Sequence, residues 1–288
     1  MRGLFLAIAA LAVGVLCAPV SSTLLEPHCG TMQRKVSYRI SGGMNAPITP
    51  WLAYIHSSTR LLCGGTLITN RFVLTAAHCI TQGIAVKVRL GEYDETTSMD
   101  CVDGVCLPRA EEYNVDMAIK HSKFSLTKQQ SDIALLRLDR IVTYRPGRIY
   151  PICIILDKSL ESRIEELQWF EAFGWGDTNS NRTRGALQTV KLQRIDKRQC
   201  RNDLQVELNH KQFCAGSEAG DTCNGDSGGP LTRIVKYEGR NRTVQIGVVS
   251  FGSVECIGIG VYTNVISYVD WIANVVQMTK DIIAPVMQ

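Results

Sequence analysis

The chain has 288 residues, of which 45% are hydrophobic and 20% are charged. This balance provides enough apolar surface for one large globular domain or two small ones, and it excludes a disordered chain. The formal net charge is +4, and the Lys and Arg residues are spread along the chain. Such a mild and dispersed charge argues against a nucleic-acid partner.

The first residues, 1–17, predict a secretory signal peptide. Arg2 precedes an apolar stretch of about 14 residues, and small residues near Cys17 and Ala18 suit cleavage by signal peptidase. A membrane anchor is the alternative, but this stretch is short for roughly 30 Å of hydrocarbon, and no other segment has ~18 uninterrupted apolar residues. We therefore expect a secreted, extracellular protein with no membrane partner, folded in an oxidising compartment.

Eleven cysteines are present, and removal of the signal peptide would take away Cys17. The ten that remain are an even set, which predicts five disulfides in an oxidising compartment. The chain has no pair of C-x-x-C clusters, so the cysteines give little support to a metal site.

Short β-rich segments recur between residues 50 and 265, separated by Gly, Asn and Asp. They cover residues 51–56, 64–69, 72–78, 86–93, 113–121, 133–138 and 187–195, and a hairpin pair at 231–237 and 244–251. Strands at this spacing predict an all-β sandwich or barrel. Only the segment 266–278 predicts a firm helix, because its apolar residues fall at helical spacing and Asp270 occupies the first turn.

Three motifs follow one another in the order His, Asp, Ser: TAAHC contains His78, SDIALLRL contains Asp132, and GDSGGP contains Ser227. A weakly acidic hydroxyl nucleophile needs a base, and the base needs a carboxylate that fixes its tautomer. Alone, His78 would be an ordinary core histidine and Asp132 a charge at a strand end. The glycines around Ser227 are more informative, because they allow a tight turn in which the Gly225 and Ser227 N–H groups converge on an oxyanion.

Together these motifs resemble those of the trypsin/chymotrypsin family of serine proteases, from about Arg39 to the C-terminal helix. The resemblance implies two antiparallel six-stranded β-barrels and a C-terminal α-helix, with the active site in the cleft between the barrels. It assigns His78 as general base and acid, Asp132 as the orienting carboxylate, and Ser227 as the nucleophile. Ser250 is similar to the family residue that donates a hydrogen bond to the aspartate.

Asp221 stands six residues before Ser227, where trypsin-like members have the floor of the primary specificity pocket. A buried carboxylate must be paired, and a substrate Arg or Lys would pair it, whereas an aromatic side chain would not. Gly252 and Gly260 match the two glycines that keep the walls of this pocket open. The resemblance therefore implies cleavage after Arg or Lys, with an ordinary loop charge as the alternative interpretation of Asp221.

Residues 38–43, YRISGG, resemble the family's zymogen cleavage site. Cleavage after Arg39 would free Ile40 as a new N-terminus, and Asp226 would receive its ammonium group. Ser41 replaces the usual valine, which bears on how tightly the new terminus inserts. The expected organisation is a signal peptide at 1–17, a pro-segment or light chain at 18–39, and a protease domain at 40–288.

The resemblance also implies five disulfides, which are Cys29–Cys153, Cys63–Cys79, Cys101–Cys106, Cys200–Cys214 and Cys223–Cys256. The first would keep the light chain tethered after cleavage. A bridged loop at 101–106 is similar to arthropod secreted trypsin-like proteases, including clip-domain enzymes, although no clip domain is expected here. One common family disulfide is absent, and Phe170 and Arg233 occupy its two positions.

Glu92 and Asp94 resemble the start of the calcium loop of some relatives, and solvated surface carboxylates are the alternative. The binding of a structural calcium ion therefore stays an open alternative, and we expect that the protein requires no cofactor. Asn181 and Asn241 each begin an N-R-T sequon, which predicts N-glycans on exposed loops.

We therefore expect a secreted serine endopeptidase, made as a zymogen, with protein or peptide substrates that carry Arg or Lys before the scissile bond. Its expected partners are an activating protease and serpin-type or other protease inhibitors. Two other classes compete with this hypothesis: an inactive homologue that acts as a binding cofactor, and a disulfide-rich structural domain. The intact motifs argue against the first, and GDSGGP with Asp221 argues against the second. A role in digestion and a role in a regulated cascade are both compatible with these features, and the tethered light chain favours a cascade.

Overall fold

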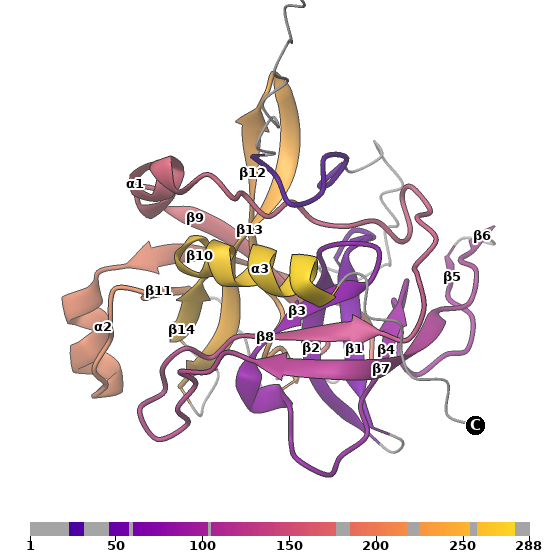
Figure 1. The fold of residues 1–288 in the computed structure, drawn as a ribbon, viewed down its shortest axis with the longest axis horizontal. Coiled ribbons are helices and arrows are strands. Elements are labelled where there is room, and N and C mark those ends of the chain that lie inside the picture. The colour runs from indigo at the N-terminus through magenta and orange to yellow at the C-terminus, as the bar shows by residue number, and fades with distance from the viewer. Residues whose placement is uncertain are drawn as a thin grey trace, which may run out of the picture.

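The computed structural model describes residues 23–31, 46–57, 60–102, 105–176, 185–217, 225–253 and 258–279. Its main strands form two closed barrels, each with six antiparallel strands (Figure 1). This architecture and a C-terminal helix, α3 (Val269–Thr279), confirm the predicted fold class. None of the helices in these residues combines the length and apolarity that a bilayer-spanning helix needs.

The first barrel, purple to pink in Figure 1, has the strand order β1-β2-β3-β8-β7-β4. The strands are β1 (Leu52–His56), β2 (Leu61–Leu67), β3 (Phe72–Thr75), β4 (Lys87–Leu90), β7 (Glu111–Lys120) and β8 (Ala134–Leu138). All five residues of β8 are buried, including Arg137. Arg137 is paired with Asp116 at 2.7 Å and donates to the Thr279 carbonyl at 2.9 Å, so its buried charge links this barrel to the end of α3.

The second barrel has the strand order β10-β11-β14-β13-β12-β9. The strands are β9 (Trp169–Gly174), β10 (Gln188–Ile195), β11 (Gln212–Ser217), β12 (Pro230–Tyr237), β13 (Arg240–Gly252) and β14 (Gly258–Asn264). The β12–β13 hairpin extends beyond the barrel and projects from the top of the molecule (Figure 1). A small hairpin of β5 (Cys101–Val102) and β6 (Val105–Cys106) lies at the opposite edge from α2 (Figure 1).

The short helices lie on the outside of the barrels. They are η1 (Ala77–Cys79), η2 (Lys158–Leu160), α1 (Glu161–Glu165), α2 (Lys197–Leu204) and η3 (Val265–Tyr268). Asp196 caps α2 by accepting from the backbone N–H groups of Arg198 and Gln199, which fixes where that helix begins. The predicted segment 266–278 corresponds to η3 followed by α3, and Val269 and Ile272 provide its buried face.

Aromatic packing occupies the place of the missing family disulfide. Phe170 is buried, and its ring lies 5.5 Å from that of Phe213. The Arg194 guanidinium lies over both rings, at 5.1 and 4.4 Å from their centroids. Arg233 donates to the Trp169 carbonyl at 3.2 Å, so both positions of the lost disulfide are held by non-covalent contacts.

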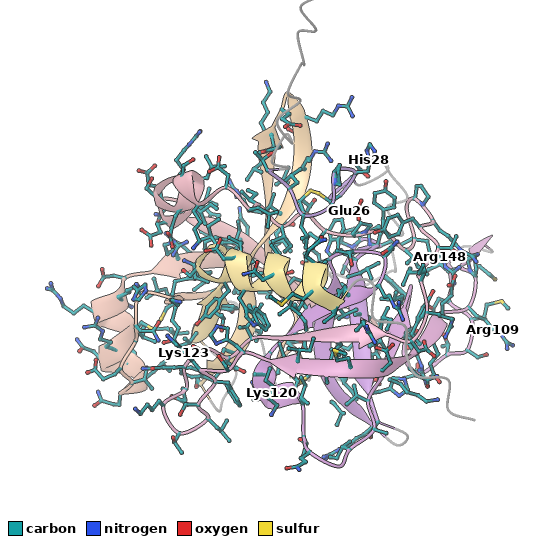
Figure 2. The ribbon with its side chains drawn as sticks, viewed as in Figure 1. Glu26, His28, Arg109, Lys120, Lys123 and Arg148 are labelled. Carbon is teal, nitrogen blue, oxygen red and sulfur yellow. A yellow bond between two sulfur atoms is a disulfide. The ribbon has the colours of Figure 1, made fainter. Side chains whose placement is uncertain are left out.

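The N-terminal segment 23–31 is attached to the second barrel. A disulfide joins Cys29 to Cys153, and Thr243 of β13 donates its backbone N–H to the Gly30 carbonyl at 2.9 Å. Leu24 is buried and forms a β-bridge with Ile155. Figure 2 shows Glu26 and His28 of this segment at the edge of the molecule, near the base of the β12–β13 hairpin.

Candidate active site

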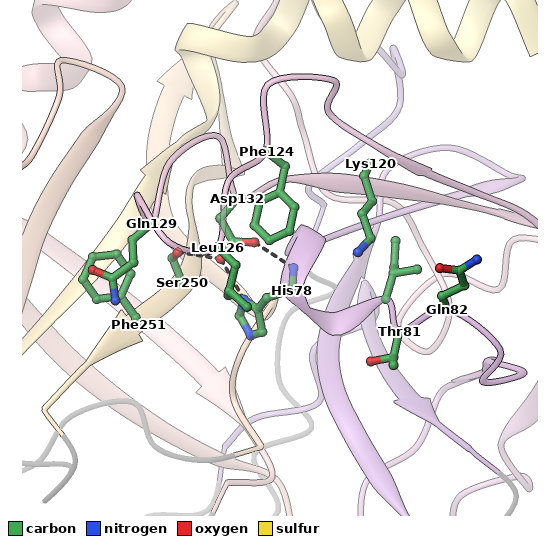
Figure 3. A pocket seen from close by; sticks show the side chains of 11 residues that line it. His78, Thr81, Gln82, Lys120, Phe124, Leu126, Gln129, Asp132, Ser250 and Phe251 are labelled. Carbon is green, nitrogen blue, oxygen red and sulfur yellow. Dashed lines mark hydrogen bonds and ion pairs between the residues drawn. The ribbon is translucent and has the colours of Figure 1, made fainter.

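A buried carboxylate, Asp132, lies at the centre of the site (Figure 3). One oxygen is 2.7 Å from His78 Nδ1 and accepts from the Ser250 hydroxyl at 2.6 Å, and the other accepts from the His78 backbone N–H at 2.9 Å. Because a carboxylate can only accept, His78 Nδ1 must carry the proton. This arrangement leaves Nε2 of a neutral His78 free to act as a base.

Both barrels contribute to the position of Asp132. His78 lies in η1, directly after β3, and Asp132 lies two residues before β8. Ser250 is on β13 of the second barrel, and Thr263 on β14 donates its hydroxyl to the Asp132 carbonyl at 2.9 Å. The sequence predicted the role of Ser250 and missed that of Thr263, for which it offers no motif.

The electrostatics of Asp132 favour its charged form. Burial alone would raise the pKa of this carboxyl group, but the hydrogen bond and charge of His78 and the Ser250 hydroxyl together hold the pKa below its usual range. Asp132 is therefore an anion at neutral pH, able to stabilise a protonated His78.

Ser227 lies in a tight turn that only glycines permit. Gly225 and Gly228 have backbone φ angles of +103° and +78°, and a side chain on Gly228 would overlap the Thr75 hydroxyl. The Ser227 carbonyl accepts from the Gly64 N–H at 2.8 Å, which attaches the turn to β2 of the first barrel.

The Gly225 and Ser227 N–H groups have no hydrogen-bond partner among the described residues. Both residues line a cavity of about 580 Å³ together with His78. Within the described structure, no hydrogen bond joins the Ser227 hydroxyl to the His78 ring, and a loose contact of this kind is common before substrate binds. The cavity thus presents a hydroxyl, a base and two unused backbone donors.

The carboxylate of Asp226 sits in a niche made by two glycines that sequence reasoning did not single out. Gly176 donates its N–H to Asp226 at 2.8 Å, and a Cβ on Gly176 would lie 2.5 Å from the same carboxylate. A Cβ on Gly174 would overlap it outright. The niche therefore fixes the Asp226 side chain directly beside the Ser227 turn.

Several predicted residues lie outside the described part of the chain, namely Arg39, Ile40, Asn181, Asp221, Cys223 and Cys256. The predicted pocket glycines are described: Gly252 of β13 and Gly260 of β14 face each other across the two strands. A Cβ on Gly260 would lie 3.0 Å from the Tyr262 hydroxyl, so this strand pair has little room for side chains.

Comparison with known proteins identifies the family of this chain. The family profile described as Trypsin matches residues 40–272, which is most of the chain. The chain belongs to the trypsin family. It is therefore a serine-type endopeptidase, as the resemblance of its motifs implied.

Three relatives illustrate the match of this protease. CLIP domain-containing serine protease B4 of Anopheles gambiae is 37% identical, over 90% of this chain and 77% of its own length. Phenoloxidase-activating enzyme 1 of Spodoptera litura is 35% identical, over 83% of this chain and 67% of its own length. The crystal structure of the Drosophila Grass clip serine protease of the Toll pathway aligns with a TM-score of 0.77 and 30% identity, over 87% of this chain and 75% of that one.

A second cavity of the protease, of about 560 Å³, is also lined by His78 (Figure 3). Its walls combine the aromatic rings of Phe124 and Phe251 with Leu126, Lys120 and Gln129. Leu126 is 68% exposed, so its side chain forms part of the outer wall of this cavity. Both cavities are lined by His78 and Thr81.

Three of the expected disulfides of the protease are present: Cys29–Cys153, Cys63–Cys79 and Cys200–Cys214. Cys106 is also disulfide-bonded, and its backbone pairs with that of Cys101 across β5 and β6. Cys63, His78 and Cys79 come close enough to suggest a metal site, but the disulfide between the two cysteines removes the thiolates that a metal would need. Asn241, in one of the two sequons, is exposed on the β12–β13 hairpin.

The acidic loop that follows β4 has donors that suit calcium. Glu92 is nearly buried, and burial with the nearby Asp100 raises its pKa to about 7, although Arg89 lies 3.5 Å away. Glu92, Glu95 and Asp100 line one hollow, whereas Asp94 accepts from the backbone N–H and hydroxyl of Thr96 and does not line it. Carboxylate oxygens are ligands that calcium prefers, and this hollow holds the Glu92 carboxylate but not that of Asp94, together with the basic side chains of Arg89 and Arg109.

Proposed function

We propose that this endopeptidase is secreted and hydrolyses peptide bonds after Arg or Lys, with Ser227 as nucleophile, His78 as general base and acid, and Asp132 as the orienting carboxylate. The observation that carries the proposal is the geometry around Asp132. Its two oxygens take three hydrogen bonds, two of them from His78, beside a cavity that His78 shares with Ser227.

The chemistry follows from these positions. The Ser227 hydroxyl attacks the substrate carbonyl carbon while its proton passes to His78 Nε2, and Asp132 stabilises the imidazolium that forms. The oxyanion accepts from the Gly225 and Ser227 N–H groups, which have no other partner among the described residues. His78 then gives its proton to the leaving amine, and water releases the acyl group by the reverse sequence.

The preference for Arg or Lys rests on Asp221 and on the two glycines that face each other on β13 and β14. A substrate cation would pair the Asp221 carboxylate, and the absence of side chains on Gly252 and Gly260 favours a long substrate side chain. Asp221→Ser should reduce kcat/KM for Arg and Lys substrates by orders of magnitude, while aromatic substrates gain relative to them.

Activation would begin with cleavage after Arg39. The new Ile40 ammonium would pair with Asp226, and this pairing would order the turn that holds the Gly225 and Ser227 N–H groups. The niche of Gly174 and Gly176 supports the proposal, because it gives Asp226 one fixed position beside the catalytic turn. The disulfide between Cys29 and Cys153 would keep the light chain attached after cleavage.

We further propose that the protease acts in an extracellular cascade, with protein substrates, an activating protease and serpin-type or other inhibitors as partners. Support comes from the names of its relatives, which include a phenoloxidase-activating enzyme and a clip serine protease of the Toll pathway. The firmly attached light chain is consistent with such regulation.

A fluorophosphonate probe tests the active-enzyme hypothesis against that of an inactive homologue. After cleavage at Arg39, the probe should label Ser227 in the wild-type protein, and the Ser227→Ala variant should stay unlabelled. An Arg39→Gln protein, shown intact by mass spectrometry, should also resist labelling after treatment with trypsin-like activators. Failure of the cleaved wild-type protein to react would support the binding-cofactor alternative, and full labelling of the uncut Arg39→Gln protein would rule out the zymogen mechanism.

A further inference from the structure

A separate cavity of about 390 Å³ lies away from Ser227, between α1, β10, the start of α2, β11 and the end of β14. These elements gather at the left of Figure 1, on the second barrel. The volume falls within the range of ligand pockets, and the lining is mainly polar. None of its residues takes part in the proposed hydrolysis.

Asn264 is the residue that points to a ligand. Asn264 lines the cavity and only 4% of its surface is exposed. Its buried Oδ1 has no hydrogen-bond partner among the described residues. Asn264 holds the N-cap position of η3, where asparagine normally accepts from the helix backbone, yet its side chain makes no capping bond. A buried carbonyl oxygen without a donor is unfavourable, so a bound N–H group would satisfy it.

Arg194 adds an unpaired positive charge beside Asn264. Its guanidinium rests on the Phe213 ring and donates to the backbone carbonyls of Leu167 and Ile164, at 2.7 and 3.2 Å. No carboxylate of the described residues lies within ion-pair distance of it; burial lowers the pKa of the guanidinium, and the more distant charge of Glu165 offsets only part of that shift. An anion in the cavity would compensate this charge and take up the Arg194 Nη1 donors that face no described acceptor.

The other charged residues that line the cavity do not occupy the Arg194 guanidinium. Two carboxylates and two basic groups surround it, which are Glu165, Asp196, Lys197 and His210. Asp196 is already engaged, because it caps the first N–H groups of α2, and Glu165 is exposed. The buried part of the cavity therefore combines one cation, one unfilled acceptor and an aromatic floor.

We propose that this cavity binds an acidic peptide segment of a partner protein, with a carboxylate on Arg194 and a neighbouring peptide N–H on the Asn264 Oδ1. A carboxylate next to an amide N–H occurs both in an Asp side chain within a peptide and at a peptide C-terminus. Both sources satisfy the two groups, so the test includes each of them.

A single hydrogen bond connects this cavity to the cavity beside His78 that Figure 3 shows. Gln212 lines it, is buried, and donates through Nε2 to the Gln129 carbonyl at 2.6 Å. Gln129 in turn lines the pocket beside His78 (Figure 3). A partner docked here would therefore lie next to a segment that lines the cavity beside His78.

The test uses the full-length Ser227→Ala protein, so that it does not depend on cleavage activity. Three uncleavable probes are titrated by NMR and calorimetry: acetyl-Ala-Asp-Ala-amide, its Asn counterpart, and acetyl-Ala-Ala-Ala with a free C-terminus. We expect saturable binding of the Asp probe, of the free C-terminus or of both, with a Kd below about 10 mM, and no binding of the Asn probe. Equal binding of the Asn probe, or no saturable binding of any probe, would overturn the proposal.

Asn264→Ala provides the decisive variant, because it removes a buried oxygen that has no partner. Its thermal stability should equal or exceed that of the parent, while probe affinity falls about three- to tenfold. Arg194→Gln should abolish binding, and Lys236→Gln, which removes the same charge from the distant β12–β13 hairpin, should leave binding intact. A clear loss of stability in Asn264→Ala, or unchanged affinity in that variant, would contradict the assignment.

Discussion

At the scale of single residues, Asp132 depends on donors from both barrels. The pKa of Asp132 is lower in the folded protein than its value of 3.8 in the unfolded chain. Ionised Asp132 therefore stabilises the fold fully above pH 3.8, and this contribution is lost as the pH falls through the lower pKa of the folded state. The Ser250 hydroxyl is one of the groups that hold the pKa down. The pH at which acid unfolds the protein should therefore depend on the Ser250 hydroxyl.

We predict that Ser250→Ala raises the pH midpoint of acid unfolding and reduces kcat/KM about three- to tenfold, because Asp132 loses one donor to its carboxylate. Near-UV circular dichroism during acid titration and peptide hydrolysis provide the two measurements. Thr263→Val is a matched control, since the Thr263 hydroxyl binds the Asp132 carbonyl rather than the carboxylate. An acid midpoint that moved equally in both variants would show that Ser250 has no specific effect on the carboxylate.

A second residue-scale prediction concerns the niche around Asp226. Gly176→Ala should lower kcat/KM of the cleaved enzyme at least about tenfold, because the new Cβ would push the carboxylate away from the catalytic turn. Gly239→Ala is the control: its Cβ would meet no atom within 4 Å, while its φ of +76° strains the tip of the β12–β13 hairpin, so it tests backbone destabilisation without contact to Asp226 and should keep full activity. Normal activity in Gly176→Ala would show that catalysis does not depend on the position that the niche gives Asp226.

Calcium provides a third prediction at this scale. If Glu92 is a ligand, millimolar calcium should raise the Tm of the wild-type protein and leave that of Glu92→Gln unchanged, because the carboxylate is a preferred hard ligand. Asp94→Asn should keep most of the response, since Asp94 does not line the hollow. Calorimetry with and without a chelator makes the measurement, and an unchanged wild-type Tm would leave Glu92 as a structural carboxylate.

At the scale of elements, the loop between β7 and β8 carries unusual backbone strain. Gln129 and Ser131 adopt left-handed conformations, with φ of 50° and 51°, although neither is glycine. Gln212 of β11 holds the Gln129 carbonyl, and Tyr268 of η3 donates to the Ser131 hydroxyl at 3.2 Å. Contacts from the second barrel thus fix a loop that belongs to the first.

We predict that Gln212→Leu loosens this loop. The unfolding free energy should fall by about 1–3 kcal/mol, because the buried Gln212 side chain loses its hydrogen bonds to Gln129 and Asn209, and KM should rise more than kcat falls. Urea denaturation and steady-state kinetics test this, with Tyr268→Phe as a milder variant of the same anchor. An unchanged KM would show that the loop geometry does not depend on Gln212.

The sequence predicted some elements better than others, for physical reasons. The β-rich segments at 133–138 and 187–195 correspond to β8 and β10, because 133–138 is a nearly continuous apolar run and 187–195 places Leu, Val, Leu and Ile among polar residues. Strands β9, β11 and β14 were not predicted, and the two latter contain glycines that weaken the strand signal. Helix α2 was also missed, since it has few apolar residues and begins at a single Asp cap.

At the scale of the whole molecule, the strand pattern alone predicted only an all-β sandwich or barrel. The resemblance carried by the three motifs implied the two barrels and the grouping of His78, Asp132 and Ser250. The niche of Gly174 and Gly176 and the bond from Thr263 join segments distant in the chain, so no local pattern reveals them. The same holds for the cavity around Asn264 and Arg194, which exists only once β10, β11 and β14 have assembled.

The central claim is cleavage after Arg or Lys by a reaction that requires Ser227. The most direct test digests a diverse peptide library with protein cleaved at Arg39 and maps every new terminus by mass spectrometry, with Ser227→Ala in parallel. We expect cuts after Arg and Lys in the wild type and a loss of activity on the order of 10⁴- to 10⁶-fold in the variant. Cuts mainly after aromatic or small residues, or cleavage by Ser227→Ala at more than about 1% of the wild-type rate, would contradict it.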